Sequence, residues 1–257
     1  MTWKNGYLPL NLLSVSLSLK LILMAGLPIQ VQAQSDSAIA NQTLPSRSIA
    51  SLTFEPPKEG KPENTEGGAS RDGGVCPQDS NTVHQPVTLL LPANHYGLTV
   101  AEHPTFFVYV PQTSAQKALF VLRDENEDYY YQKTLSIPPK AGIVSFKLPA
   151  DAPVIEIGKG YKWSFVLICG DTLKPDSPRG EGRIKRIQPN PALSSQLQNL
   201  SPLERASLYG KDGIWYDTLT SLAELKRSQS DNLTLTANWE KLLRSVGLEA
   251  IATKPLL

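Results

Sequence analysis

Histidine and cysteine, which often serve as catalytic groups and metal ligands, are scarce in this sequence. Its 257 residues include 3 His and 2 Cys, and neither G-x-S-x-G nor H-E-x-x-H occurs. Nucleophilic catalysis needs an activated Ser or Cys beside an oriented base, and a zinc site needs ligands at suitable spacing. We therefore expect no catalytic residues, no metal and no cofactor.

The three histidines, His84, His95 and His103, lie close together in the sequence. Imidazole suits zinc and copper, so one hypothesis is a metal site. No carboxylate or thiol completes a usual ligand spacing, and each histidine lies near a proline or a turn. The preferred interpretation is structural, with His103 before Pro104 at the entry to a strand.

An excess of charge of either sign is also missing. Lys and Arg total 25 against 24 Asp and Glu, which gives a formal net charge of +1. Such a balance gives no argument for a nucleic-acid partner or an acidic substrate. After the N-terminal region, no apolar run is long enough to cross a membrane.

The N-terminus has the pattern of a cleaved signal peptide. Positive charge precedes a short apolar run, Leu21–Leu27, and small residues follow for cleavage after Ala33. A membrane anchor over Leu8–Ile29 is the alternative, but Lys20 within that span would be costly in a bilayer. We expect residues 1–33 to be removed and the protein to be exported, to the periplasm or outside the cell.

Export changes the interpretation of the two cysteines. Cys76 follows a glycine-containing stretch, and Cys169 ends an apolar run. Cysteines in an oxidising compartment usually pair, so we predict a disulfide between them. Two unpaired thiols are the alternative. A bridge would join the start of the folded domain to its centre.

Residues 34–75 have the composition of a linker. Ser, Pro, Glu, Gly, Asn and Lys dominate, and Phe54 is the only aromatic residue. The prolines of Pro56–Pro62 are incompatible with a helix or a central strand. The segment has too little apolar surface to offset the conformational entropy that it would lose on folding. We therefore predict that it is disordered.

Residues 76–190 follow a strand pattern, and Tyr161–Cys169 is its strongest part. One face of that stretch carries, at period two, Tyr161, Trp163, Phe165, Leu167 and Cys169. Other apolar runs, such as Phe106–Val110 and Ile143–Leu148, are short and end at Pro, Gly or Asn. This pattern predicts an antiparallel β-sandwich of the immunoglobulin or fibronectin kind, with Tyr161–Cys169 as its central strand.

Residues 191–257 change to helical periodicity. Ser201–Glu204 is a capping box, Gly213–Asp217 opens a second helix, and Ser230–Asn232 caps a third. Three amphipathic helices with short connections indicate a small antiparallel bundle or hairpin. A single helical hairpin cannot bury its own apolar face, so we expect it to dock on the sandwich.

Several short motifs together give the chain a family resemblance. The matching stretches are Thr99-x3-His103-Pro104-Thr105-Phe106, Gly142-Ile143-Val144, Leu148-Pro149, Gly158-Lys159-x-Tyr161-x-Trp163, Leu203-Glu204, Gly213-Ile214-Trp215-Tyr216-Asp217 and Trp239-x2-Leu242-Leu243-x-Ser245-Val246-Gly247-Leu248. The chain resembles the cyanobacterial exported proteins catalogued as domain of unknown function 928. The resemblance implies an exported location and this architecture, and it supplies no catalytic residues.

Trp215, Tyr216 and Asp217 form one candidate interaction surface. Two aromatic rings and a carboxylate at a helix start could line a groove for a partner. The alternative is a hinge that packs the helices onto the sandwich, since aromatic rings are mostly core residues. The carboxylate near the helix N-terminus is favoured by the helix dipole in either case.

Two further surfaces have the same two interpretations. Tyr129 and Tyr131, beside an acidic turn, could anchor a partner or could simply favour a hairpin. A basic stretch with Arg179, Arg183, Lys185 and Arg186 could bind anionic envelope polymers or could protect an edge strand.

The predicted function is non-catalytic. The signal, the linker and the missing catalytic constellation indicate an exported, envelope-associated module that binds an unknown protein or an envelope polymer. The alternative is a carbohydrate-active hydrolase of the envelope, which two facing carboxylates would support.

Overall fold

The computed structural model describes residues 52–57, 75–79, 85–124, 126 and 130–257. All of them fall in one compact unit, Ser46–Leu257. The predicted signal peptide, residues 1–33, lies outside the described residues. The strands are β1 (Thr88–Leu89), β2 (Tyr96–Thr99), β3 (Thr105–Val110), β4 (Lys117–Asp124), β5 (Tyr130–Ser136), β6 (Gly142–Lys147), β7 (Gly160–Ile168) and β8 (Arg179–Arg186). The helices are α1 (Pro191–Leu197), α2 (Pro202–Lys211), α3 (Trp215–Ser228), α4 (Leu233–Ser245) and the short 3-10 helix η1 (Glu249–Ile251).

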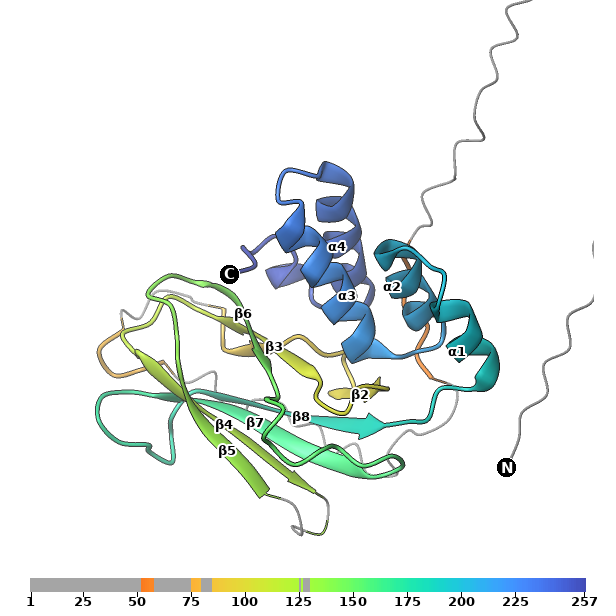
Figure 1. Cartoon of the computed structure of the whole chain (residues 1–257). Coiled ribbons are helices and arrows are strands. Elements are labelled where there is room, and N and C mark those ends of the chain that lie inside the picture. Colours follow the sequence, from red (N-terminus) through yellow and green to blue (C-terminus); the bar gives the residue numbers. More distant parts are fainter. Residues whose placement is uncertain (1–51, 58–74, 80–84, 125, 127–129) are drawn as a thin grey trace, which may run out of the picture. The chain divides into compact units, whose positions relative to one another are not determined.

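The strands form two sheets (Figure 1). One has five strands in the order β2-β8-β7-β4-β5, and the other has three in the order β1-β3-β6. Every strand pair within them is antiparallel except β2 with β8. The expectation of mostly antiparallel sheets followed by helices is therefore confirmed.

β7 occupies the central position that its alternating pattern predicts. It pairs with β4 on one side and with β8 on the other. Tyr161, Trp163 and Phe165 are buried, whereas Lys162 between them is exposed. The buried side chains face the other sheet, since Trp163 and Phe120 of the five-stranded sheet both contact Phe106 of β3, each with ring centroids 4.8 Å apart. Residues of both sheets therefore share one apolar core.

The disulfide is confirmed. Cys76 and Cys169 are bonded, with their Cα atoms 5.3 Å apart and a sequence separation of 93. Next to it, the Asp79 carboxylate accepts hydrogen bonds from Thr113 Oγ1 at 2.7 Å and from the Ser114 amide at 2.6 Å. The bridge thus joins the start of the strand region to the end of β7.

The helices begin where the capping residues predict. Ser201 accepts from the Glu204 amide while Glu204 bonds back to the Ser201 amide, which completes the predicted capping box. The Asn232 side chain caps α4 by accepting from two backbone amides. α1 is an addition to the three predicted helices, and Asn190 caps it just before the proline at its first turn. None of the helices that the structure describes is long and apolar enough to cross a membrane.

α3 docks on the strands through buried hydrogen bonds at its N-terminal end. Trp215 Nε1 donates to the Leu90 carbonyl at 2.7 Å, and Trp163 Nε1 donates to Tyr216 Oη at 2.8 Å. Gly97 of β2 lies so close that a Cβ there would be 2.7 Å from the Tyr216 ring. The helices lie together on one side of the strands in Figure 1.

Residues 52–57, which we call the strap, belong to this folded unit and not to the predicted linker. Leu52 is fully buried, and the Phe54 ring meets Trp215 edge-on with centroids 4.9 Å apart. The Glu55 amide donates to the Gly210 carbonyl at 3.0 Å. A Cβ on Gly210 would lie 2.5 Å from the Thr53 oxygen, so only glycine permits this close approach. Composition failed here because two apolar side chains suffice to attach a short segment.

We predict that Phe54→Ala lowers the free energy of unfolding by about 1–3 kcal/mol, less than for a fully buried Phe because this ring is only partly buried. Urea unfolding of the protein measures the change. Thr53→Ala is the matched control, since the Thr53 residue is exposed and its backbone contact survives. Equal stability of Phe54→Ala and the unmodified chain would show that the strap adds nothing to the fold.

Candidate functional site

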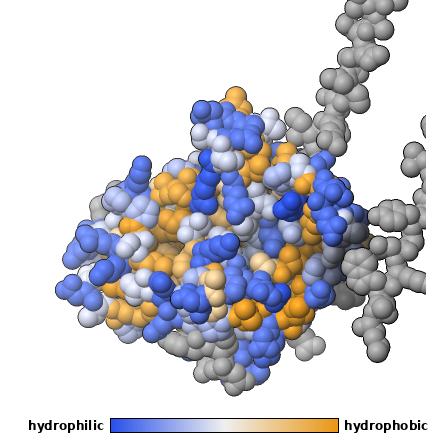
Figure 2. Space-filling model, viewed as in Figure 1, coloured by the Kyte–Doolittle hydropathy of each residue, from blue (hydrophilic) through white to orange (hydrophobic). Residues whose placement is uncertain are grey.

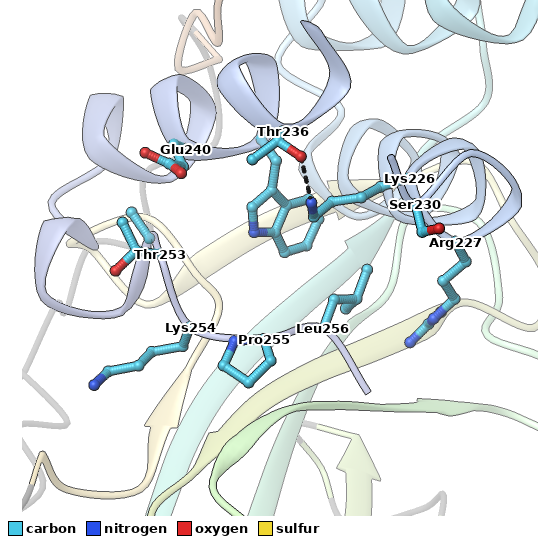
Figure 3. Close-up of a pocket in the computed structure, with 11 residues that line it drawn as sticks. Lys226, Arg227, Ser230, Thr236, Glu240, Thr253, Lys254, Pro255 and Leu256 are labelled. Atoms are coloured by element: carbon cyan, nitrogen blue, oxygen red, sulfur yellow. Dashed lines mark hydrogen bonds between the residues drawn. The ribbon is translucent and has the colours of Figure 1, made fainter. Parts of the chain in front are cut away.

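A cleft of about 390 Å³ lies among α3, α4 and the residues after η1 (Figure 3). Its described lining residues are Lys226, Arg227, Ser230, Thr236, Trp239, Glu240, Ala252, Thr253, Lys254, Pro255 and Leu256. Three of them are cations and three carry hydroxyl groups. We call this site the cationic cleft. Its volume is within the usual range for ligand pockets.

The last turn of α3 provides two of the cations. Lys226 and Arg227 lie at the C-terminal end of that helix, where the helix dipole favours positive charge. Lys226 Nζ donates to Thr236 Oγ1 of α4 at 2.7 Å, a bond that crosses the cleft (Figure 3). This bond fixes the ammonium group between the two helices.

Arg227 reaches across to β6. One of its terminal nitrogens donates to Ser145 Oγ at 2.9 Å and to the Leu257 main-chain oxygen at 2.8 Å. Burial lowers the pKa of Arg227, and the nearby Glu224 opposes that shift. The guanidinium remains charged at any physiological pH, because its ordinary pKa lies far above that range.

The third cation, Lys254, lies on a segment that β6 holds in place. The Ile143 amide donates to the Pro255 carbonyl at 2.7 Å, and the Leu257 amide donates to the Ile143 carbonyl at 2.9 Å. Lys254 Nζ lies 5.9 Å from the centre of the Tyr109 ring. Figure 3 shows Lys254 and Arg227 on opposite sides of Pro255 and Leu256, so the positive charges are spread along the cleft.

The charges of the cleft are not balanced from within. Glu240 is the one carboxylate among the described lining residues, and it pairs with Arg244 at 3.3 Å. Within the described part of the chain, no ion pair joins Lys226, Arg227 or Lys254 to an Asp or Glu side chain, although the charge of Glu224 acts on Arg227. Trp239 Nε1 is buried and has no acceptor among the described atoms. The cleft therefore presents an excess of donors and positive charge, which suits an anionic ligand.

Trp215 and Tyr216 do not form the open groove that we considered. Both side chains are buried, at 0% and 2% exposed. Tyr216 Oη accepts from Trp163 and donates to the Arg183 carbonyl at 3.2 Å, and burial raises its pKa. The rings pack the helices onto the strands, because full burial stabilises them more than exposure to water would.

Tyr131 is partly buried rather than displayed. Its ring contacts Phe120 with centroids 6.4 Å apart, and burial is the main cause that raises its pKa, with a smaller contribution from the charge of Asp151. Tyr129 lies outside the described residues. Within the described part of the chain, the predicted aromatic surface is therefore reduced to Tyr131, whose ring packs against the core.

The basic stretch of β8 does not protect an edge. β8 lies between β2 and β7, because β2 pairs in parallel with Arg183–Arg186, so the edge-strand interpretation is wrong for Arg183, Lys185 and Arg186. Arg186 donates to the carbonyls of Val100 and Ile155 and to the Glu102 carboxylate. Its guanidinium holds loops together instead of facing a polymer.

The histidines form no metal site within the described residues. His84 lies outside them, and no cluster of three or more metal-binding side chains occurs among the rest. His103 Nε2 lies 3.2 Å from the Ala152 carbonyl, as expected for a structural residue. His95 adopts a positive φ of 53° in the turn before β2.

One spacing that sequence reasoning passed over is S-x-x-K at Ser114 and Lys117. Both residues are exposed, and Lys117 begins β4 while Ser114 lies in the preceding loop. Catalysis requires the nucleophile within hydrogen-bonding reach of its base. No hydrogen bond joins the two side chains here, so we assign them no role.

The cationic cleft was also missed from the sequence. The signal available was the pair Lys226–Arg227 at the end of an amphipathic helix, which is common on any solvated helix. The cleft exists because the segment with Lys254 pairs with Ile143, more than a hundred residues earlier in the chain. No local pattern carries that contact.

Asp217 ties the start of α3 to the end of β2. Its carboxylate accepts from Thr99 Oγ1 at 2.8 Å and from the Val100 amide at 3.1 Å. Burial nevertheless raises the pKa of Asp217 to about 6, since these hydrogen bonds offset only part of the desolvation. The folded protein thus binds a proton at Asp217 more tightly than the unfolded chain does.

We predict the following pH dependence. As pH rises from about 4 to about 7, ionisation of Asp217 removes up to about 3 kcal/mol of stability, because the folded pKa lies above the unfolded one. Asp217→Asn retains an acceptor oxygen and cannot ionise, so its stability should fall less over this range. Urea unfolding at pH 4, 5, 6 and 7 tests this, with the exposed Asp171→Asn as the control. Parallel pH curves for Asp217→Asn and the unmodified chain would contradict the prediction.

Comparison with known proteins identifies the family of the folded unit and covers all of its described residues except the strap and the last residue. A family model described as Domain of Unknown Function (DUF928) matches residues 66–256. No curated protein matches the chain. The match spans both cysteines, all the strands and helices described above, and the lining of the cleft, and it begins after the strap. The resemblance drawn from the sequence is confirmed at this level: the chain belongs to the DUF928 family.

Proposed function

We propose that this protein is an exported, non-catalytic binding module that holds an anionic polymer of the cell envelope in the cationic cleft. The observation that carries the proposal is the set of three cations, none of which forms an ion pair with an Asp or Glu side chain among the described residues. A cation left without a counter-ion in a cleft attracts an anion, because the charge is partly shielded from water there.

The placement of the charges favours a polymer over a single small anion. Arg227 and Lys254 stand on opposite sides of Pro255 and Leu256, so their charges do not converge on one point (Figure 3). A chain with repeated negative groups can meet both charges at once, and each further contact raises the effective concentration of the next.

Export is supported by the disulfide, since such bonds persist mainly in oxidising compartments. The signal pattern of residues 1–33 supports it independently. The shared core of the two sheets supports a β-sandwich of the immunoglobulin or fibronectin kind as the scaffold. Such scaffolds carry many functions, so the site and not the fold supports the function.

The hydrolase alternative finds no support at this site. Glycoside hydrolysis uses two carboxyl groups about 5–9.5 Å apart. Among the described residues of the cleft, Glu240 is the single carboxylate and already pairs with Arg244. A binding role uses the cations that are present, whereas hydrolysis would need a second acid.

We predict that the exported chain binds polygalacturonate and does not bind dextran, a neutral polymer. Lys254→Gln should weaken polygalacturonate binding up to about fivefold at low salt, the effect of one exposed ion pair. Added salt should weaken binding by the unmodified chain further, because it screens exposed charges. Isothermal titration calorimetry measures both effects.

The matched control is Lys174→Gln, since Lys174 is exposed and does not line the cleft. It should bind as the unmodified chain does. Equal loss of affinity in Lys174→Gln and Lys254→Gln would mean that general charge and not the cleft attracts the polymer. Dextran binding as tight as that of polygalacturonate would also contradict the proposal.

A further inference from the structure

A second cavity, of about 130 Å³, lies between the two sheets beside the edge strands β5 and β6. The residues that line it are Phe106, Val108, Phe120, Leu135, Ser136, Ile137, Val144, Ser145, Phe146 and Phe165. We call it the inter-sheet cavity. It shares no lining residue with the cationic cleft.

The inter-sheet cavity suits an apolar group. Eight of its ten lining residues are apolar, four of them Phe, and two are Ser. One of the two hydroxyl groups, Ser145 Oγ, already accepts a hydrogen bond from Arg227. An apolar cavity of roughly 150 Å³ stays dry and binds a molecule as small as benzene. A space of this size and composition therefore holds a short stretch of hydrocarbon.

The walls of the cavity reach the surface. Leu135, Val144 and Phe146 are each partly exposed, while Phe106 and Phe120 at the inner end are buried. Hydrophobic residues also gather over the strands on the face that Figure 2 shows. A ligand can consequently enter between β5 and β6 without separation of the sheets.

A cation lies on the cavity side of β5. Lys133 pairs with Phe120 in register, and residues opposite each other in a sheet point to the same face. Phe120 faces the other sheet, since its ring lies 4.7 Å from that of Phe146. Lys133 is exposed and forms no ion pair with a described residue. Its aliphatic stem can follow the apolar wall while the ammonium group stays in water.

We propose that the inter-sheet cavity binds the alkyl end of a single-chain anionic amphiphile, such as a medium-chain carboxylate, whose head group pairs with Lys133. The apolar lining accounts for the chain, and the cation on the same face accounts for the charge.

Lys133 also has a simpler role to be tested against this one. An inward-pointing charge on an edge strand prevents pairing with another chain. That role requires no ligand, no saturable binding and no preference for an anionic head. The ligand experiments therefore distinguish the two roles.

The test compares three probes by isothermal titration calorimetry: decanoate, 1-decanol and acetate, each below the concentration at which it aggregates. Decanoate should bind saturably and more tightly than decanol, and acetate should not bind. Lys133→Gln should weaken decanoate binding about three- to fivefold, as expected for one exposed ion pair, and leave decanol binding unchanged. Lys140→Gln, at an exposed lysine outside the cavity, is the control and should change neither.

A second pair of variants fills the space. Val144→Trp places a larger ring at the cavity wall and should abolish decanoate binding while polygalacturonate binding is retained. Because a large ring can disturb folding, Leu135→Phe gives a milder test and should weaken decanoate binding without a change in the urea midpoint. These readouts are independent of the cationic cleft, so failure here leaves the proposed function untouched.

Four results would overturn the inference. One is the absence of saturable decanoate binding, and another is decanoate binding that neither filling variant weakens. A third is equal affinity for decanoate and decanol with no effect of Lys133→Gln, which would leave only the edge-protecting role. The last is binding to anionic vesicles without binding to monomeric decanoate, which would indicate a membrane surface instead of a single chain.

Discussion

A buried hydrogen bond between Trp163 and Tyr216 holds the two halves of this protein together. Trp163 lies at the centre of β7 and Tyr216 in the first turn of α3, and the 2.8 Å bond between them satisfies both side chains. Tyr216 passes a further hydrogen bond to the Arg183 carbonyl of β8. An unsatisfied polar group at this depth would cost roughly 1–3 kcal/mol. The strands and helices are therefore interdependent, and neither buries its rings without the other.

The same contact positions the cationic cleft. α3 is anchored at its first turn and has 14 residues, so its last turn lies roughly 16 Å along the helix axis from the anchor. Lys226 and Arg227 are in that last turn, and Arg227 meets Ser145 of β6 there. Both ends of α3 are thus fixed to different sheets. A helix attached at two points presents its cations at defined places, which a mobile helix could not do.

The local parts of this fold were predictable from the sequence. The alternation of Tyr161, Trp163 and Phe165 predicted the central strand, and the Ser201–Glu204 capping box predicted the start of α2, because both patterns act between near neighbours. The Cys76–Cys169 pairing was predictable because a chain with two cysteines has a single possible intramolecular disulfide.

The contacts between distant segments were not predictable in this way. The strap is held by Gly210 and Trp215, which follow it by more than 150 residues. Composition alone made it a linker, since its apolar residues are few. The parallel pairing of β2 with β8 likewise means that the basic stretch does not lie on an edge strand. No pattern within either strand predicts this pairing. Trp215 and Tyr216 were placed among the candidates because sequence cannot distinguish an exposed ring from a buried one.

The two proposed sites both arise from the way this protein treats the edges of its sheets. At β6 the edge is covered, because Pro255 and Leu257 hydrogen-bond to Ile143, and Gly142 leaves room for Leu257 to approach. That covering segment brings Lys254 to the cleft. On the edge strand β5, Lys133 lies on the face toward the cavity. A charge at such a position also discourages the strand from pairing with another chain. The edge strands of a sheet must be covered or carry charge to prevent association with other chains. In this protein, covering β6 places Lys254 beside the cationic cleft, and the charge on β5 places Lys133 beside the inter-sheet cavity.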